Sequence, residues 1–539
     1  MAEFDTEVLV VGAGPVGLMM AVELHRHDVA CRIIERSPEV SLKCRALHVQ
    51  ARTLELLEHL GLAEAAMELG VRVRAENIWK DGNLLQRIPL DWDPLPGIPF
   101  PMMLNLEQNK LEALLSDHLT RLGGRVERGV ALKGVSQVPE SVTATVGTPN
   151  SVDHIRCRYL VGCDGSTSLV RKEMGLPFEG YPYPDTYIMA DVEVEGWLAP
   201  EESHRFIRGE EVLLATPIRG NHRFRIVMRD NGPSQVSPSE YGFIDEGRPA
   251  ALQDIQRALD RVARPGLHLI NNRKTSHYRV SRRLASRFRK GRIFLAGDAA
   301  HLFPDAGGQG MNTGIQDAWA LAWRLASDLR GFATWTLLGS YEVERRHVAA
   351  EVADRTDRAF RTRTELLDLE VEESPQLWMQ NWAQLETNYR GLPGFEEHGS
   401  RPGKAALEAG DRAPDGNLEL PGKDSLRVFD LLKGTSSHAF FFFRGLELPS
   451  ELARLAAWLE QHRSHQVRCH FIREICSPSP EGLSPLYCDP GGALATRYGA
   501  REDSVILVRP DGYVGFRADA MHADRLLGWL DRLLGPVED

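Results

Sequence analysis

The sequence predicts an α/β protein of several domains, and three observations support this fold class. The first 36 residues alternate an apolar strand, a helix and a second strand, which is the pattern of a Rossmann-like unit. Residues 180–285 instead hold short alternating segments such as "RFRIVM", which indicate a mostly β insertion. After residue 410, strands such as "HAFFFFRG" alternate with amphipathic helices, which indicates a separate α/β domain.

Changes in composition along the chain predict the domain boundaries. A nucleotide-binding domain is expected to begin with residues 1–179, to be interrupted by the β insertion at 180–285, and to resume with a turn and long helices over 286–390. Residues 391–410 are rich in glycine and charge, so we expect a linker there. Residues 411–539 are expected to form the C-terminal domain.

The composition of this 539-residue chain argues against several classes of protein. The formal net charge of −11 disfavours a nucleic-acid partner, because binding the phosphate backbone needs a basic surface. No apolar run reaches the ~20 residues of a membrane helix, and the acidic N-terminus is unlike a signal peptide, so we expect a cytoplasmic protein. The seven cysteines include no CxxC pair and no zinc-binding spacing, which favours a reducing compartment and no metal site. Cys469, Cys476 and Cys488 are therefore expected to be ordinary buried thiols.

The strand, turn and helix near the N-terminus carry a dinucleotide-binding pattern. "VGAGPVG" contains G-x-G-x-x-G at Gly12, Gly14 and Gly17, between a predicted strand and a predicted helix. Gly12 permits the tight turn, Gly14 lets a pyrophosphate approach the backbone, and Gly17 lets the helix pack closely on the strand. Glu35 ends the next strand, where a carboxylate accepts hydrogen bonds from a ribose diol. These residues predict a nucleotide cofactor without deciding between NAD and FAD.

A second glycine-rich turn follows the apolar strand at 293–296 and opens a helix near Met311 and Asn312. Asp298 stands at the end of that strand, where it can bond a hydroxyl of a sugar chain. The N-terminus of the helix would face the edge of a flavin ring that becomes negatively charged on reduction. The two turns together therefore favour FAD.

Three stretches of the sequence resemble the motifs of single-component FAD-dependent aromatic hydroxylases. They are "VGAGPVGLMMAVEL" with "IIER", "VGCDGSTSLVRKEMG", and "GDAAHLFPDAGGQGMNTGIQDAWALAWRL". This family is the class A flavoprotein monooxygenases of the p-hydroxybenzoate hydroxylase fold. The C-terminal "GDRAP", "VFDLL", "RYGA" and "VILVRPDGYVGFR" are similar to the thioredoxin-like domain of its phenol hydroxylase and polyketide hydroxylase branch. The resemblance covers most of the chain and is weakest over 180–280.

The resemblance implies an activity and a set of cofactor-binding residues. The activity is hydroxylation of a phenolic or polycyclic aromatic substrate through a flavin C4a-hydroperoxide, with NADPH or NADH and O2 as co-substrates. The implied cofactor-binding residues are Gly12, Gly14, Pro15, Val16, Gly17, Glu35, Arg36, Arg45, Gln108, Asp164, Gly165, Arg171, Asp298, Pro304, Gly310, Met311 and Asn312. In the family, the motif that matches Asp164, Gly165 and Arg171 serves both FAD and NADPH.

Two positions depart from the family pattern. Asp305 stands where the family often has a second proline, and it either faces solvent or places a charge near the flavin. Leu47 stands where related phenol hydroxylases carry an aspartate, the candidate base that deprotonates a phenol. The neighbouring His48 can take that catalytic role, since an imidazole titrates near neutral pH, or it can be a structural histidine.

The substrate pocket is expected between the FAD-binding domain and the inserted sheet. Candidates for its lining are Tyr181, Tyr183, Tyr187, Phe206, Phe224 and Met228. Arg219 and Arg225 either anchor an acidic substituent or are solvated strand residues. The alternatives to a hydroxylase are another flavin oxidoreductase of this fold, such as an NADPH oxidase or a quinone-forming enzyme, and a non-enzymatic flavoprotein that binds aromatics. The sequence leaves open which aromatic is used, which nicotinamide reductant is used, and whether the protein is a homodimer.

Overall fold

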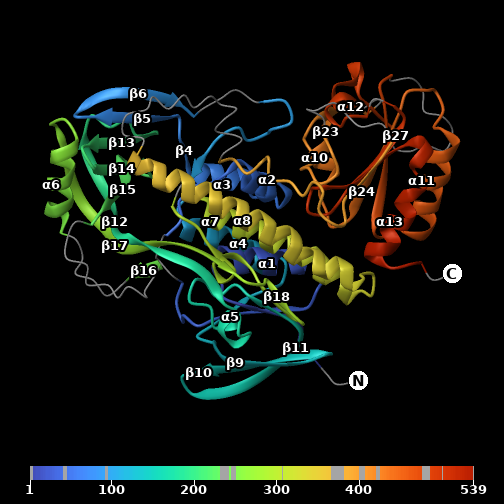
Figure 1. The fold of residues 1–539 in the computed structure, drawn as a ribbon, viewed down its shortest axis with the longest axis horizontal. Helices are drawn as coiled ribbons and strands as arrows, with labels where there is room; N and C mark the ends of the chain where they lie inside the picture. The colour runs from blue at the N-terminus through green and yellow to red at the C-terminus, as the bar shows by residue number, and fades with distance from the viewer. Residues whose placement is uncertain are drawn as a thin grey trace.

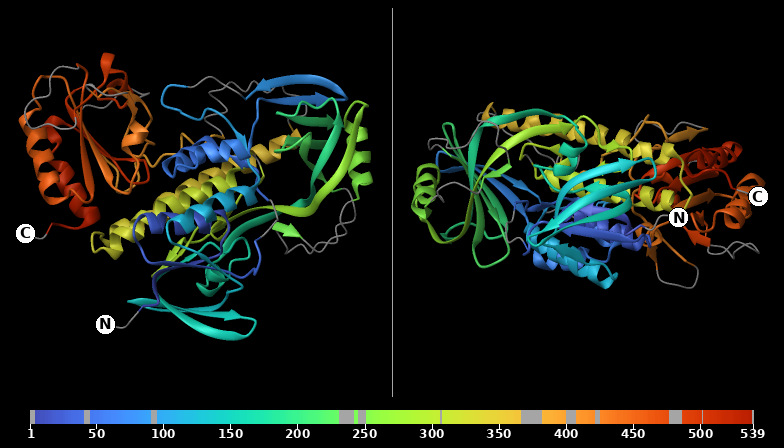
Figure 2. Two further views of the ribbon diagram at one scale, coloured as in Figure 1. Left: turned by 180° about the vertical axis from the view of Figure 1, so that it is seen from behind. Right: turned by 90° about the horizontal axis from the view of Figure 1, so that it is seen from below.

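The computed structural model describes residues 4–40, 45–90, 95–230, 242–244, 251–305, 307–365, 382–399, 407–420, 425–475, 486–500 and 502–537. Within these residues, three large sheets follow one another across the molecule (Figure 1). The second sheet and the C-terminal sheet lie at opposite ends in every view, with the first sheet and the long helices between them (Figure 2). This mixed α/β architecture confirms the predicted fold class.

The first sheet is built of parallel strands around β1. β1 (Thr6–Val11) pairs in parallel with β2 (Cys31–Glu35) and β11 (Ser151–Gly162), β11 pairs with β19 (Ile293–Leu295), and β2 pairs with β8 (Val126–Arg128). Antiparallel strands extend it: β9 (Ala131–Val138), β10 (Ser141–Thr148) and β18 (Arg289–Lys290). Because the carboxyl ends of parallel strands share one edge, the turns after β1, β11 and β19 converge there.

Helices pack on this sheet and carry further side chains to the same edge. α1 (Pro15–Arg26) packs against α4 (Gln108–Arg121) and α7 (Gln309–Leu329), and α7 packs against α8 (Trp335–Glu365). Apolar side chains of β1, α1, α4 and α7 share one core. Shorter elements complete this part: β3 (His48–Val49), α2 (Ala51–His59), α3 (Ala63–Leu69), β4 (Val71–Arg72), β7 (Leu104–Asn105), α5 (Leu169–Glu173) and η1 (Gly297–Ala299).

The second sheet contains more than the predicted insertion. Its order is β16 (Gly242–Ile244), β17 (Leu267–Ala285), β12 (Phe178–Gly196), β15 (Arg223–Arg229), β14 (Glu211–Pro217), β13 (Glu202–Arg208), β5 (Ala75–Lys80) and β6 (Asn83–Pro89). β20 (His301–Leu302) pairs with β17, so strands from both sides of the insertion join it. One face of the sheet packs on α6 (Leu252–Val262) and forms a separate apolar core. The two parts of the chain are therefore tied together through shared strands.

The C-terminal domain has its own sheet and its own cores. The strand order is β21 (Glu396–His398), β28 (Val514–Asp519), β27 (Ser504–Val508), β24 (Ser437–Phe443), β25 (Val467–Arg473) and β26 (Leu486–Cys488). α11 (Ser450–His462) and α13 (Arg525–Leu534) cover one face, and α10 (Val428–Leu431) and α12 (Ala493–Arg497) contribute to the core on the other face. β21 comes from the segment 391–410, which is thus not a free linker throughout, because it supplies an edge strand of this sheet.

One prediction about the cysteines of this domain is wrong. Cys488 is disulfide-bonded, whereas the absence of a CxxC pair predicts a thiol. Its partner and the predicted thiol of Cys476 lie outside the described residues. Cys469 is a free, half-buried cysteine, as predicted.

Candidate active site

A cavity of about 370 Å³ lies where the carboxyl edge of the first sheet, the N-terminus of α7 and the second sheet meet. The predicted site residues that line it are Gly14, Pro15, Val16, Arg45, His48, Gln108, Gly165, Asp298, Pro304, Gly310 and Met311. The predicted site residues outside this lining are Gly12, Gly17, Glu35, Arg36, Asp164, Arg171 and Asn312. The structure therefore brings five segments, distant in sequence, to one cavity.

The three glycines of the first turn occupy different environments. Gly12 has φ +100°, and a Cβ there would lie 2.4 Å from the carbonyl oxygen of Cys163. A Cβ on Gly17 would lie 1.9 Å from the carbonyl oxygen of Gly12. At Gly14, by contrast, a Cβ would meet nothing within 4 Å, because this residue faces the cavity at the uncapped N-terminus of α1. The backbone N–H groups of such a helix end bind anions.

Glu35 supports the same turn from behind. Its Oε2 accepts a hydrogen bond from the backbone N of Ala13 at 2.9 Å, and its Oε1 accepts one from Ser37 N at 2.9 Å. The neighbouring Arg36 is exposed. The carboxylate thus lies at the end of β2 beside the glycine turn, which is the position that a ribose contact requires.

Side chains at the "CDGS" motif and in α5 fix the turn before α5 and the neighbouring turn at Ala299. Asp164 accepts hydrogen bonds from the hydroxyl of Ser168 at 2.5 Å and from the backbone N of Leu169 at 2.7 Å, at the start of α5. Arg171 is buried; its Nη1 donates to the carbonyl of Ala299 at 2.8 Å, and its Nη2 donates to that of Ser166 at 2.9 Å. In this structure both side chains hold backbone next to the cavity.

The flavin-proximal turn presents one carboxylate and one helix end to the cavity. Asp298 is exposed to the cavity within η1, and desolvation raises its pKa. α7 begins after Gly308, which has φ +62°, and Gly310 and Met311 line the cavity. Asn312 is buried behind them; it accepts from Gln50 N at 2.9 Å and donates to the carbonyl of His48 at 2.9 Å. Asn312 therefore joins β3 to the start of α7.

Arg45 and Gln108 come from two further segments that line the cavity. The Oε1 of Gln108 accepts from Ala46 N at 3.0 Å, and its Nε2 donates to Glu112 at 2.8 Å. The amide of Gln108 thereby fixes the segment that carries Arg45. The guanidinium of Arg45 is exposed and belongs to the cavity lining.

His48 has a defined orientation in the cavity wall. Its Nδ1 lies 2.8 Å from the Oδ1 of Asn105, and Asn105 Nδ2 donates to the carbonyl of Pro217 at 2.9 Å. Because that second bond orients the amide, Oδ1 is the acceptor and His48 Nδ1 carries the proton. Burial lowers the pKa of His48, against the opposing effect of the hydrogen bond to Asn105. The imidazole is therefore neutral near pH 7, with an unprotonated Nε2.

The second sheet forms the other wall, but not with the residues considered from sequence. The lining side chains are Met189 from β12, Leu214 and Thr216 from β14, Arg225 and Val227 from β15, and Tyr278, Arg279, Val280 and Ser281 from β17. None of Tyr181, Tyr183, Tyr187, Phe206, Phe224 and Met228 lines the cavity.

For Phe206, Phe224 and Met228 the physical reason is strand alternation, since successive side chains point to opposite faces. Phe206 and Phe224 lie on the face that packs against α6. Tyr183 and Tyr187 share the parity of the lining residue Met189, but they lie nearer the start of β12, where they cluster with Phe360 of α8. No feature of the sequence indicates which face of each strand borders the cavity.

The two arginines named from sequence have different environments. Arg225 is buried, and its Nε and Nη2 donate to the carboxylate of Asp191 at 2.8 and 3.0 Å. Arg219 is exposed and does not line the cavity. Asp305 is accessible, as a solvent-facing residue would be, but it belongs to the cavity lining and accepts a hydrogen bond from the hydroxyl of Tyr278 at 3.2 Å.

Sequence reasoning missed Asn105 and Tyr278, because neither lies in a motif. Each reaches the site through pairing between distant strands, Asn105 beside His48 in the β3–β7 pair and Tyr278 on β17. Among the described residues, no group of His, Cys, Asp and Glu side chains is arranged to hold a metal ion. No helix in the described part of the chain is long and apolar enough to cross a membrane.

Comparison with known proteins shows which family this chain resembles. Residues 5–356 match the family model described as the FAD binding domain, and residues 407–537 match the aromatic-ring hydroxylase C-terminal domain. The chain is 31% identical over 531 residues to a flavin-dependent monooxygenase of Mycobacteroides abscessus, covering 95% of this chain and 97% of that one. It is 30% identical over 565 residues to pentachlorophenol 4-monooxygenase of Sphingobium chlorophenolicum, covering 98% and 97%.

The fold agrees with solved structures of the same kind of enzyme. A ternary complex of aklavinone-11 hydroxylase with FAD and aklavinone superimposes with a TM-score of 0.79 at 26% identity, covering 99% of this chain and 100% of that one. The match extends over all three sheets, because nearly the whole of both chains is covered. The chain therefore belongs to the family of FAD-dependent aromatic monooxygenases.

Proposed function

We propose that this enzyme uses NADPH or NADH and O2 to hydroxylate a phenolic or polycyclic aromatic ring held between the flavin site and the second sheet. The observation that carries the proposal is the single cavity that joins two open helix N-termini, at Gly14 and Gly310, to a wall of sheet side chains. His48 lies in this cavity with its proton on Nδ1.

The residues present fit FAD. The backbone at Gly14, Gly165 and Gly310 leaves space in which a Cβ would meet nothing within 4 Å, so a cofactor can approach it closely. In our proposal the turn at Gly12–Gly17 binds the pyrophosphate, Glu35 with Arg36 lies at the ribose, and Arg45 with Gln108 faces the ribityl region. Asp298 bonds the ribityl chain, and Pro304 to Asn312 form the flavin-proximal turn.

Bound FAD supplies the redox chemistry, taking electrons from the nicotinamide and activating O2 for insertion into an electron-rich ring. The chain's own task is to hold that ring and to exclude water. Met189, Leu214 and Val227 give the sheet wall an apolar surface that suits an aromatic ring. Arg225 adds little net charge to this wall, because Asp191 pairs with it.

His48 is proposed to take the phenolic proton. Its Nε2 is the unprotonated nitrogen, since Nδ1 donates to Asn105. Removing the proton makes the ring more electron-rich at the carbon that is hydroxylated. The hydrogen bond to Asn105 orients the imidazole and stabilises the imidazolium that forms.

The test is to purify the protein, confirm that denaturation releases FAD, and screen phenols, quinolones and polyketide aromatics. We expect slow NADPH oxidation alone, fast oxidation with the correct aromatic, and one hydroxylated product per NADPH. Comparison of NADPH with NADH at equal concentration decides the reductant. Fast NADPH oxidation without any aromatic, producing only peroxide, would favour an NADPH oxidase instead.

Location and assembly are part of the proposal. Dependence on a nicotinamide reductant favours the cytoplasm, where that pool is maintained, and thiol counting at Cys488 in protein prepared without oxidant checks the redox environment. Sedimentation of the purified protein distinguishes a homodimer from a monomer.

A further inference from the structure

The turn that carries Asp298 is held on both sides of this residue. The backbone N of Gly297 donates to Oδ2 of Asp317 at 3.0 Å. The carbonyl oxygen of Ala299 accepts from Nη1 of Arg171 at 2.8 Å. Asp317 belongs to the middle of α7 and Arg171 belongs to α5, so two separate helices fix the peptide groups that flank Asp298.

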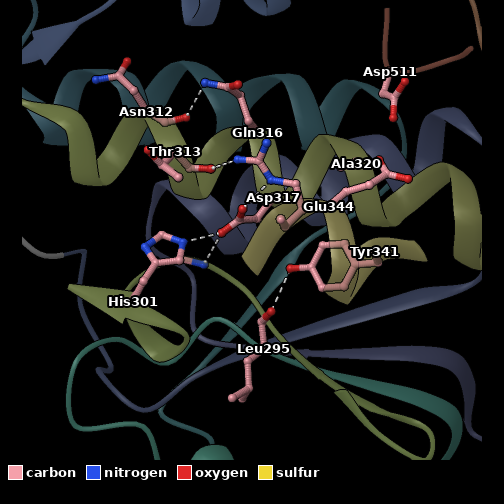
Figure 3. A network of polar contacts seen from close by, with 12 residues as sticks. Leu295, His301, Asn312, Thr313, Gln316, Asp317, Ala320, Tyr341, Glu344 and Asp511 are labelled. Carbon is pink, nitrogen blue, oxygen red and sulfur yellow. Dashed lines mark hydrogen bonds and ion pairs between the residues drawn. The ribbon is translucent and has the colours of Figure 1, made fainter. Parts of the chain in front are cut away.

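Asp317 is the centre of a buried network (Figure 3). Besides Gly297, its Oδ2 accepts from Nε2 of His301 at 2.6 Å, and its Oδ1 accepts from Nε of Arg345 at 2.7 Å. Arg345 also donates to the carbonyl of Thr313 at 3.2 Å. Burial alone would raise the pKa of Asp317, but His301 and Arg345 lower it below its usual value, so the carboxylate remains ionised.

Close packing links this turn to the wall of the cavity. Gly297 has φ +63°, and a Cβ there would lie 2.8 Å from Cγ2 of Val16. A Cβ on Gly314 of α7 would lie 2.6 Å from the same methyl group and 2.9 Å from Cα of Gly297. A shift of the turn relative to α7 must therefore displace Val16, which lines the cavity.

We propose that Asp317 is a positioning residue that sets the Asp298 turn against α7 and so shapes the site for the flavin. It does not line the cavity, and it acts through Gly297 and His301. The proposal rests on the FAD placement proposed above. Without the carboxylate, the N–H of Gly297 and the ring of His301 lose their common acceptor. The Asp298 side chain then moves away from the ribityl chain that we propose it bonds.

The principal test is Asp317→Asn in the full-length protein. We measure the dissociation constant of FAD by titrating apo-protein, together with the visible absorption spectrum and the reduction potential of the bound flavin. The amide has the size of the carboxylate but offers one acceptor oxygen. We expect FAD to bind at least about tenfold more weakly, which corresponds to losing one hydrogen bond to a charged group. The flavin spectrum and the potential should also shift.

Glu344→Gln is the matched control. Glu344 is another fully buried carboxylate of the α7–α8 pair; it accepts from Arg324 at 2.7 Å and from Arg509 at 2.8 Å. Figure 3 shows it beside the same helices. We expect this variant to lower the unfolding temperature while keeping the FAD dissociation constant within about twofold. Equal weakening of FAD binding in both variants would mean that Asp317 contributes only to stability, and would overturn the proposal.

A second pair keeps the proposal testable if Asp317→Asn does not fold. His301→Gln retains a donor toward Asp317, whereas His301→Leu removes it. We expect His301→Leu to weaken FAD binding and His301→Gln to restore most of the affinity. Unchanged FAD binding and spectrum in His301→Leu and in any folded Asp317→Asn would refute the inference alone. A wild-type protein that does not bind FAD would instead refute the proposed function.

Discussion

The two walls of the cavity are built from different parts of the chain. The wall at the starts of α1 and α7 and at the turn before α5 presents open backbone at Gly14, Gly165 and Gly310, where a Cβ would meet nothing within 4 Å. The wall formed by the second sheet presents side chains, such as those of Met189 and Val227. A wall of backbone recognises a ligand common to many relatives, while a wall of side chains can be altered one residue at a time.

This difference separates two kinds of sensitivity to substitution. On the backbone wall any added Cβ matters, because space at a helix N-terminus is what an anionic group needs. On the sheet wall the identity of a side chain matters only when it points toward the cavity. Substitutions on the two walls should therefore have separable effects on cofactor and on substrate.

The largest expected effects come from two glycines of the same turn. Gly17→Val places a side chain against the carbonyl oxygen of Gly12, which a Cβ would approach to 1.9 Å, so we expect no stably folded protein. Gly14→Val adds its side chain in open space, so we expect a folded apo-protein that does not retain FAD. Circular dichroism and flavin content of the purified variants check both outcomes. Full flavin content in Gly14→Val would show that the pyrophosphate lies elsewhere.

The backbone wall is also the part of the site that the sequence predicts best. Glycine spacing constrains local geometry, and the positive φ of Gly12 and the close approach at Gly17 are local consequences of the motif. A helix N-terminus follows directly from a strand–turn–helix pattern. The fold class, the cavity-facing position of Gly14 and that of Asp298 were accessible from sequence for this reason.

The sheet wall could not be predicted in the same way. Its lining depends on which parity of β12, β14 and β15 faces the cavity, and a shift of one residue exchanges the two faces. Phe206 and Phe224 are aromatic and suitable for a pocket, yet they fill the core against α6. The contacts of Asn105 and Asp317 are long-range, so no local pattern indicates them.

The next largest effect is expected at His48, which lies where the two walls meet. His48→Asn removes the base and should lower kcat on a phenol by about 100-fold, the usual contribution of general-base catalysis, with FAD affinity unchanged. The wild-type kcat/KM should fall on acidification, with the limb on the acid side of an ordinary imidazole, because burial lowers the pKa of His48 and its protonated form is inactive. This acidic limb should be absent in His48→Asn.

A substrate methyl ether provides the control for the base. It has no phenolic proton, so its slower reaction should be insensitive to His48→Asn. Equal losses on the phenol and on the ether would show that His48 only shapes the cavity.

A smaller effect is expected on acid stability, through one buried histidine beside α7 and one in the second sheet. Burial lowers the pKa of His59, which packs against Trp319 of α7, to about 3, and that of His204 in the second sheet to about 4. Between these values and about 6.5, the unfolded chain binds protons that the folded chain does not, so stability is lost as the pH falls. Each group should remove about 2 kcal/mol between pH 6.5 and pH 5.

Urea unfolding of His59→Phe and His204→Phe at pH 7 and pH 5 measures these contributions. Each variant should lose less stability on acidification than the wild type. Below pH 4 only the contribution of His59 should keep growing, because the pKa of His204 is reached there. An unchanged pH dependence in His59→Phe would show that this histidine is protonated in the folded protein.

The smallest expected effect tests the sheet wall itself. Val227 lines the cavity, while Met228, the next residue of β15, faces the α6 side. Val227→Phe should lower kcat/KM for polycyclic substrates about tenfold, the cost of misfitting a hydrophobic pocket by a few carbon atoms. It should affect single-ring phenols less, and leave FAD affinity unchanged.

Met228→Phe adds a comparable ring to the opposite face and should leave both substrate classes unaffected. If the two variants alter substrate preference equally, the effect acts through the sheet as a whole and Val227 does not contact substrate. If Val227→Phe instead weakens FAD binding, the two walls are not separable and the cofactor reaches further toward the sheet than we propose.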